Sequence, residues 1–282
     1  MQKITIVGAG TMGNGIAHIS ALANYKTILT DLSQAQLEKA HANIMQNLDK
    51  GIARGKVTLD EKQRVVDNLS LEIDLATAVQ NADMVIEAIP ENIDWKKDLL
   101  QRIDALTPEH TILASNTSSL SIAELANCVS NPSQVIGMHF FNPVHIMELL
   151  EIVFVPDCTS QEVIEMVQNY AKAVQKTSIL VKNSPGFATS RLGIVLGMEA
   201  IRMLEEGVAS AEDIDTAMVL GYRHPIGPLK LTDLVGLDVR LDIATYLEKE
   251  LNSAAFTPPQ LLKDMVANGQ LGKKSKSGFY QW

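Results

Sequence analysis

Three glycines near the start of the chain constrain its fold more than any other feature. They lie in the run Gly8-Ala9-Gly10-Thr11-Met12-Gly13, which directly follows the apolar segment Ile4–Val7. Between a strand and a helix, this spacing permits a tight turn, a close approach of the backbone to a ligand and close packing of the helix on the strand. The N–H groups at the start of such a helix favour an anionic phosphate. The run therefore predicts a dinucleotide-binding turn with contacts from Gly8, Gly10, Met12 and Gly13.

An acidic residue follows the next expected strand, Thr27–Thr30. Asp31 stands 18 residues after Gly13, close to the separation at which dinucleotide-binding folds place a carboxylate against the adenosine ribose. A carboxylate there accepts hydrogen bonds from ribose hydroxyls and repels a 2′-phosphate. The expected cofactor is therefore NAD rather than NADP.

Short β-branched runs alternate with helical stretches in the first half of the chain, which is typical of a parallel sheet with crossover helices. Apolar residues at helical spacing predict one long helix from about Ser33 to Gly55, and a second helix from about Asp60 to Asn68 completes a helical hairpin. The fold class is thus α/β: a Rossmann-like, mostly parallel sheet with a helical-hairpin insertion, followed by an all-α C-terminal part. The expected strands are Ile4–Val7, Thr27–Thr30, Met84–Ile89, Thr111–Ala114, Gln134–Phe140, Leu149–Val155 and Thr177–Val181.

The strand pattern stops at Asn183-Ser184-Pro185-Gly186, and helical periodicity continues from there. Ser184 as N-cap and Pro185 at the first helical position predict a helix through about Glu206, which Gly207 ends. We expect an NAD-binding domain of residues 1–183 and an all-helical domain of residues 184–282 for substrate binding and dimerisation. The segments Ile194–Leu204 and Leu231–Leu241 are too apolar for so small a domain to bury alone, which predicts a homodimer.

Composition excludes several classes of partner. The net charge of -9 argues against nucleic acid as a partner, because binding to its backbone needs a positive surface. No apolar run reaches the roughly 18 residues of a membrane span, and no secretory signal precedes the first strand, so we expect a cytoplasmic protein without a membrane partner. Cys128 and Cys158 lack the spacing of a metal site or a disulfide framework, and we expect no metal.

A histidine and a glutamate occupy apolar strands, where a polar side chain is costly to bury. His139 lies near the end of one strand, and Glu151 lies inside the run Leu149–Val155. A histidine held by a buried carboxylate is the usual construction of a general base near neutral pH. The pattern leaves open whether the two side chains meet. A core imidazole with another partner and a glutamate paired elsewhere are the alternatives.

Further polar residues follow strands and are therefore expected at the carboxyl edge of the sheet, where such folds bind ligands. In the loop Ser115–Ser121, Ser121 and Glu124 fit a capping box, which leaves Ser118 for another role. Glu91 and Lys96 follow the strand that ends at Ile89, although a solvated carboxylate and an exposed lysine are the alternative. The cations Lys50, Arg54 and Lys56 lie at the end of the long helix, where the helix dipole alone could explain them.

Six motifs extend across essentially the whole chain: GAGTMGNGIA, EAIPENIDWKK, ASNTSSLSI, HFFNPVHIMELLEIV, SPGFATSR and GPLKLTDLVGLD. In this order they resemble the 3-hydroxyacyl-CoA dehydrogenase family, in particular its bacterial short-chain members. The resemblance implies an enzyme that reversibly oxidises a (3S)-3-hydroxyacyl-CoA with NAD, with 3-hydroxybutyryl-CoA as the expected substrate. It also implies that the helical hairpin holds the adenosine phosphates of CoA and that the C-terminal domain dimerises.

The resemblance assigns roles to individual residues. The serine that binds the substrate oxygen is Ser118, the base is His139, and the glutamate that orients the base is Glu151. The implied cofactor contacts are Gly8 to Gly13, Asp31, Glu91, Lys96, Asn116, Ser118 and Asn142. The implied substrate contacts are Ser118, Asn142, Lys50, Arg54 and Lys56.

The chain departs from the family pattern at two places. Family members commonly carry PGFxxNR, whose asparagine belongs to the catalytic set, whereas this chain has Ser190 there. A serine is shorter and has one hydroxyl, so its role stays open between Ser190 itself, a water and Asn142. The loop after HFFNP usually reads PVM followed by lysine and here contains His145–Glu148, which predicts an altered acyl specificity. We expect His145 to be a loop residue and not a second base.

Two other functions remain compatible with these residues. The first is an NAD-dependent dehydrogenase of a free hydroxy acid such as a sugar acid, which would keep the fold and the base. The second is a protein that retains NAD for a structural purpose, against which the complete set of Ser118, His139 and Glu151 argues.

Overall fold

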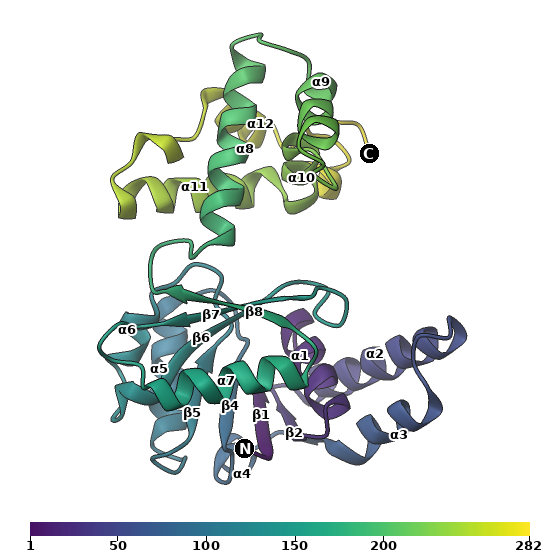
Figure 1. Ribbon diagram of the computed structural model, residues 1–282, viewed down its shortest axis with the longest axis vertical. Coiled ribbons are helices and arrows are strands. Elements are labelled where there is room, and N and C mark those ends of the chain that lie inside the picture. The colour runs from purple at the N-terminus through teal and green to yellow at the C-terminus, as the bar shows by residue number, and fades with distance from the viewer. The chain divides into compact units, whose positions relative to one another are not determined.

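The computed structural model describes residues 1–282, and the chain divides into two units, Met1–Ser184 and Pro185–Trp282 (Figure 1). Each unit has its own hydrophobic core. None of the helices combines the length and the apolar character that crossing a membrane requires.

Unit 1 is built on an eight-stranded sheet with the order β3-β2-β1-β4-β5-β6-β7-β8. Only β6 and β7 pair antiparallel, and every other pair of neighbours is parallel. This arrangement confirms the predicted α/β class with a mostly parallel sheet. The strands are β1 Lys3–Val7, β2 Lys26–Thr30, β3 Leu69–Glu72, β4 Met84–Glu87, β5 Ile112–Ser115, β6 Val135–Phe140, β7 Leu149–Phe154 and β8 Thr177–Lys182.

Seven α-helices surround the sheet, and two of them form the predicted hairpin. Ser33 caps α2, and a capping box of Thr58 and Glu61 starts α3. In Figure 1 this hairpin projects sideways from the sheet, with the turn after Ala53 at its tip. The helices are α1 Thr11–Leu22, α2 Gln34–Ala53, α3 Leu59–Asn68, α4 Leu75–Val79, α5 Ile93–Asp104, α6 Ile122–Ala126 and α7 Gln161–Ala173.

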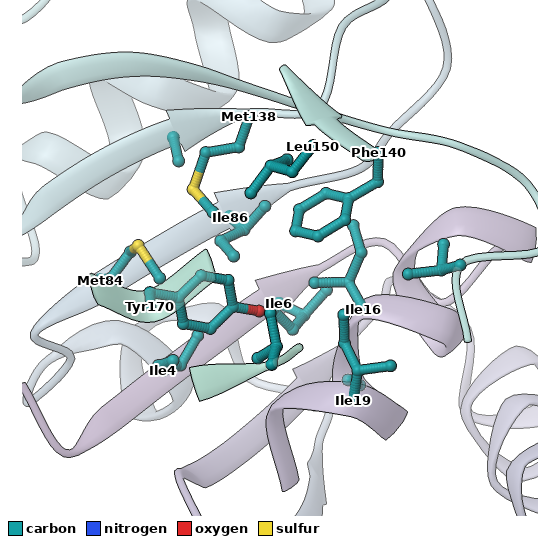
Figure 2. Packing of buried hydrophobic residues seen from close by; sticks show 14 of the residues in the cluster. Ile4, Ile6, Ile16, Ile19, Met84, Ile86, Met138, Phe140, Leu150 and Tyr170 are labelled. Carbon is teal, nitrogen blue, oxygen red and sulfur yellow. The ribbon is translucent and has the colours of Figure 1, made fainter. Parts of the chain in front are cut away.

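The core of unit 1 fixes α1, the helix that follows the glycine turn. Alternate residues of a strand point to one face of a sheet, and on this face apolar side chains of four strands meet residues of α1 and α7 (Figure 2). The hydroxyl of buried Tyr170 is satisfied by Ser20 Oγ of α1 at 2.7 Å. The side chains labelled in Figure 2 are Ile4, Ile6, Ile16, Ile19, Met84, Ile86, Met138, Phe140, Leu150 and Tyr170.

Unit 2 is entirely helical, as predicted. Asp233 holds its C-terminal segment by accepting hydrogen bonds from Phe279 N, Tyr280 N and Trp282 Nε1, each at 2.8–2.9 Å. The elements are α8 Thr189–Glu205, α9 Ala211–Thr216, η2 Ala217–Gly221, α10 Pro228–Val235, α11 Leu237–Leu251, η3 Ala254–Phe256, α12 Gln260–Ala267 and η4 Lys273–Ser275.

The predicted start of the first helix of unit 2 was wrong. Residues 185–188 form a turn, and α8 begins at Thr189 without a side-chain cap. Gly186 and Phe187 have φ values of 72° and 48°, and such positive values cannot continue a right-handed helix. Hence Pro185 is not the first helical residue. The predicted end is confirmed, because Gly207 at φ 71° follows the C-cap directly.

Other differences are smaller. Strand β3, which was not predicted, follows α3 without any intervening turn residues. Strand β4 ends at Glu87 rather than at Ile89, and Gln134 belongs to a 3-10 turn, Pro132–Gln134, before β6. Ser121 caps α6 as predicted, but the carboxylate of Glu124 pairs with Lys97 at 2.9 Å.

Candidate active site

The glycine turn has the geometry that its spacing predicts. Gly8 has φ 102°, and a Cβ atom there would lie 2.8 Å from the backbone oxygen of Ala88. A Cβ on Gly13 would lie 1.7 Å from the backbone oxygen of Gly8, so only glycine lets α1 pack this closely. By contrast, a Cβ on Gly10 would meet nothing within 4 Å. The backbone at Gly10 is therefore open to a ligand, at the start of α1.

A cavity of about 850 Å³ adjoins this turn. Asp31 lies on its wall and accepts hydrogen bonds from Ala9 N at 2.8 Å and Ser33 N at 3.1 Å. The carboxylate is thereby fixed at the carboxyl end of β2, as expected for a ribose-binding acid. Gly8, Gly10 and Met12 also line the cavity. The turn and the cavity thus fit a dinucleotide.

Several residues that line the same cavity were not predicted from the sequence. Trp95, Asp98 and Arg102 of α5 reach it. The indole of Trp95 is 59% exposed, although aromatic side chains are usually buried. A tryptophan directly before two lysines in the motif EAIPENIDWKK was the signal in the sequence that could have drawn attention to this wall.

His139 and Glu151 meet. They are register partners on the antiparallel pair β6 and β7, so their side chains share one face of the sheet. His139 Nδ1 lies 2.6 Å from Glu151 Oε2. Glu151 is fully buried and His139 is 7% exposed. A hydrogen bond from Nδ1 to the carboxylate fixes the ring tautomer, which leaves Nε2 as the nitrogen that can accept a proton.

Glu91 organises the serine loop after β5. One of its oxygens, Oε1, accepts from Thr117 Oγ1 at 2.6 Å, Ser118 N at 3.0 Å and Ser119 N at 3.2 Å. The hydroxyl of Ser118 lies 3.2 Å from the same oxygen. A carboxylate that gathers this many donors fixes the position of Ser118. Glu91 therefore lies at the predicted edge of the sheet, and it contacts the serine loop directly.

Lys96 is enclosed rather than exposed. Its ammonium donates to both carboxylate oxygens of Glu87 at 2.8 Å and to the oxygen of Ile89 at 3.2 Å, and Lys96 and Glu87 both have 0% exposed side chains. Glu87 also accepts a short hydrogen bond from Ser115 Oγ, and Glu91 Oε2 lies 3.7 Å from the ammonium. The alternative of an exposed lysine is thus wrong. Glu87 was missed, because a glutamate at the end of an apolar strand gave no sign of its partner.

Asn116 connects the serine loop to the strand of His139. Its side-chain oxygen accepts from Phe140 N at 3.0 Å, and β5 and β6 are parallel neighbours. Ser118 and His139 therefore emerge from adjacent strands at the carboxyl edge of the sheet. Asn142 follows β6 and is exposed.

Loop 143–148, between β6 and β7, is anchored from two sides. Lys176 donates to the backbone oxygens of Val144 and Met147, both at 2.6 Å, and burial lowers the pKa of its ammonium. A Cβ atom on Gly15 of α1 would lie 2.7 Å from Val144 Cβ. This close contact joins the loop to the helix that follows the glycine turn.

Two histidines lie beside each other at this loop. The rings of His145 and His18 have centroids 5.7 Å apart. Burial, with a smaller contribution from His145, lowers the pKa of His18 to about 4. His145 is exposed and contacts neither His139 nor Glu151 in any described interaction, in keeping with a loop residue.

The remaining candidate residues belong to the helical hairpin and to unit 2. Lys50, Arg54 and Lys56 are exposed at the tip of the hairpin, and only Lys50 has a side-chain partner there, Gln46 at 3.1 Å. Ser190 belongs to unit 2, where it occupies the first turn of α8 and is half-buried.

The chain matches two family models. Residues 3–184 match the NAD binding domain of 3-hydroxyacyl-CoA dehydrogenase. Residues 186–282 match the C-terminal domain of 3-hydroxyacyl-CoA dehydrogenase.

Individual relatives agree with these models over the whole of this chain. The 3-hydroxybutyryl-CoA dehydrogenase of Clostridioides difficile is 40% identical, with 100% of this chain and 99% of that protein covered. The mitochondrial hydroxyacyl-coenzyme A dehydrogenase of Rattus norvegicus is 39% identical, with 100% and 91% covered. Among solved structures, (S)-3-hydroxybutyryl-CoA dehydrogenase from Ralstonia eutropha matches with a TM-score of 0.96 at 40% identity, covering 100% of this chain and 99% of that one.

These matches confirm the resemblance inferred from the motifs, and with it an enzyme rather than a protein that holds NAD for structure alone. The chain belongs to the 3-hydroxyacyl-CoA dehydrogenase family.

Proposed function

We propose that this enzyme oxidises a short-chain (3S)-3-hydroxyacyl-CoA, in particular 3-hydroxybutyryl-CoA, reversibly to the 3-ketoacyl-CoA, with NAD as cofactor. The observation that carries the proposal is the buried pair of His139 and Glu151 at the carboxyl edge that also bears the glycine turn. Relatives named 3-hydroxybutyryl-CoA dehydrogenase, at 40% identity over the full chain, support the choice of substrate.

In the proposed reaction, His139 Nε2 takes the proton from the 3-hydroxyl while the C3–H bond breaks and the C3–O bond becomes a carbonyl. The nicotinamide, when bound, supplies the acceptor for the hydride that leaves C3. The charge on the resulting imidazolium is stabilised by Glu151 at Nδ1. Ser118 holds the substrate oxygen, and Glu91 fixes the serine in place. Reduction of the ketone runs through the same groups with His139 protonated at the start.

Steady-state kinetics with 3-hydroxyacyl-CoA substrates of increasing chain length test this proposal. We expect turnover with 3-hydroxybutyryl-CoA and NAD, and none with free 3-hydroxybutyrate or with sugar acids. Turnover of free hydroxy acids without the CoA esters would favour the alternative, a dehydrogenase of free hydroxy acids.

A first prediction concerns the choice of cofactor. Because the fixed carboxylate of Asp31 would face a 2′-phosphate, kcat/KM should be higher for NADH than for NADPH. Asp31→Ala should weaken NADH binding and narrow the preference by about tenfold or more, since like charges brought together are strongly repulsive. The control is Asp60→Ala, which removes an exposed carboxylate at the start of α3. Equal kcat/KM for both cofactors in the unmodified enzyme would contradict the assignment.

We propose further that Lys50, Arg54 and Lys56 bind the adenosine phosphates of CoA. These three exposed cations lie within seven residues at one end of the hairpin, and they supply a local positive field on a chain of net charge -9. A cationic tip that projects from the sheet is accessible to a phosphate.

Arg54→Ala combined with Lys56→Ala should raise KM for the acyl-CoA by about threefold to tenfold and leave kcat almost unchanged. Exposed charges contribute modestly, and a remote contact stabilises ground and transition states alike. Lys39→Ala, which removes an exposed lysine further back on α2, is the matched control. A loss of NADH affinity with unchanged KM for acyl-CoA would show that these cations bind the nicotinamide cofactor and not CoA.

We also propose roles for the other candidate residues in binding the cofactor and the substrate. Gly8, Gly10, Met12, Gly13, Asn116 and Asn142 contact the cofactor, and Asn142 also contacts the substrate. Lys96 acts on this site through Glu87 and Glu91, because its own side chain has no exposed surface. Residues 1–183 form the NAD-binding domain, and residues 184–282 bind the substrate, with Ser190 near it, and form a homodimer.

Part of the surface of unit 2 supports the dimer. Within Leu231–Leu241, Leu234, Val235 and Val239 are exposed, whereas none of the large apolar side chains of Ile194–Leu204 is exposed. We therefore assign the contact mainly to the former segment. A molar mass twice that of the chain by light scattering is the expected result.

A further inference from the structure

Three large apolar side chains of unit 1 lie exposed on the wall of one cavity. Leu32 is 92% exposed, Ile73 51% and Trp95 59%, and all three line the cavity of about 850 Å³ beside the glycine turn. They come from segments far apart in the sequence: after β2, after β3 and in the first turn of α5. Single exposed apolar residues are common, but a group of them around one cavity is typical of a ligand-binding surface.

The residues of α5 that line the cavity share one face of the helix, because they are spaced three or four positions apart. They are Trp95, Asp98, Leu99 and Arg102. Leu99 is buried, and the exposed side chains of Asp98 and Arg102 pair with each other at 3.8 Å. The indole of Trp95 is therefore the one large apolar surface that this face offers to a ligand.

The cofactor carries a flat aromatic group that suits such a surface. In the proposed function its phosphates lie at the glycine turn, and its adenosine ribose lies against Asp31, which also lines the cavity. The adenine ring is bonded directly to that ribose and therefore lies near it. A neutral base needs no charged partner, and aromatic side chains bind bases by stacking on their π faces.

We propose that Trp95 is a specificity residue for the cofactor, which stacks its indole on the adenine ring, while Leu32 and Ile73 complete an apolar slot for that ring. This inference rests on the proposed function, in which NAD is the cofactor. The adenine of CoA is a less suitable occupant. CoA carries a phosphate on the 3′-oxygen of its adenosine ribose, and the carboxylate of Asp31 repels an anion at that ribose.

Tryptophan fluorescence tests the contact without turnover. The chain has two tryptophans, and Trp282→Phe leaves Trp95 as the single indole. Trp282 belongs to unit 2 and does not line the cavity. In this variant, ADP-ribose should quench most of the emission, because it contains the adenine and a stacked base quenches an indole by contact. Nicotinamide mononucleotide, which lacks the adenine, should leave the emission nearly unchanged at the same concentration.

Substitutions at position 95 of the otherwise unmodified chain separate stacking from mere apolar contact. Trp95→Ala should raise the Kd of ADP-ribose and the KM for NADH by about five- to hundredfold, the usual loss when a stacking aromatic is removed. Trp95→Phe should keep most of the affinity, and Trp95→Leu should fall between the two. In all three, kcat at saturating NADH should stay nearly unchanged, because the adenine is remote from the hydride transfer. Leu106→Ala, which truncates an exposed leucine outside the cavity, is the control and should keep the Kd.

The inference is overturned by any of three results. The first is an unchanged Kd of ADP-ribose in Trp95→Ala, which means that the base does not touch the indole. The second is quenching by CoA but not by ADP-ribose, which assigns the slot to the other adenine nucleotide. The third is an equal loss in Trp95→Phe and Trp95→Ala, which excludes stacking as the cause. Each can occur in an enzyme that still turns over 3-hydroxybutyryl-CoA, whereas quenching by ADP-ribose without any turnover would count against the proposed function alone.

Discussion

Replacing His139 with glutamine should lower kcat by about 10²–10⁴-fold in both directions of the reaction, which is the usual contribution of a general acid–base group. The amide of glutamine keeps a polar group near the position of the ring, but it cannot take up the proton of the 3-hydroxyl. Because Glu151 is fully buried and 2.6 Å from the ring, it stabilises the positive charge that forms at this histidine. The measurement is steady-state kinetics of 3-hydroxybutyryl-CoA oxidation and of acetoacetyl-CoA reduction.

The pH profiles of the two directions make this prediction specific. Oxidation requires the neutral imidazole and should become faster as the pH rises, whereas reduction requires the protonated ring and should become slower. His139→Gln should abolish both dependences, and Glu151→Gln should lower kcat because a neutral amide no longer stabilises the imidazolium. His110→Gln, which changes an exposed histidine after α5, is the control and should keep both profiles. A His139→Gln enzyme with nearly normal kcat would refute the mechanism.

The arrangement of the sheet was predictable because each crossover carries its own local signals. The glycine turn identified the first strand and helix, and β-branched runs identified most of the other strands. Strand β3 was missed because it follows α3 directly, so no turn residues separate it from the helix. The start of α8 was misplaced because Ser184-Pro185 is a common way to begin a helix. The backbone of Gly186 and Phe187 then overrides that local preference with positive φ values.

In the candidate site, too, some features were visible in the sequence and others were not. Single residues such as His139, Glu151 and Asp31 stand out as polar groups within or beside apolar strands. Their partners depend on register and on packing between strands, which no local pattern contains. The separation of 12 positions from His139 to Glu151 does not reveal that an antiparallel return places the two directly opposite each other. Glu87 was missed because an isolated charge in an apolar segment looks the same in the sequence whether it is solvated, paired or unpaired.

The largest loss of stability is expected from Lys96→Met. The substitution keeps the volume of the side chain but leaves Glu87 as a carboxylate with no exposed surface and no cation at 2.8 Å. Removing one partner of a buried ion pair typically lowers the free energy of unfolding by about 3–5 kcal/mol, because the remaining charge is uncompensated. Ser115 Oγ and Ile89 N still donate to Glu87, but neither carries a charge. Urea unfolding at neutral pH measures the difference in the free energy of unfolding between Lys96→Met and the unmodified enzyme.

A second substitution separates the charge from the packing. Glu87→Gln together with Lys96→Met removes both charges, and this double variant should recover a large part of the stability that Lys96→Met loses. Lys97→Met is the matched control: the neighbouring lysine pairs with Glu124 at the surface and should contribute little. The loss in free energy of unfolding caused by Lys96→Met should also become smaller as the pH falls. A buried carboxylate without a cation becomes neutral when it takes up a proton, which removes the unfavourable charge. If the double variant is no more stable than Lys96→Met, the loss comes from the shape of the site and not from the unpaired charge of Glu87.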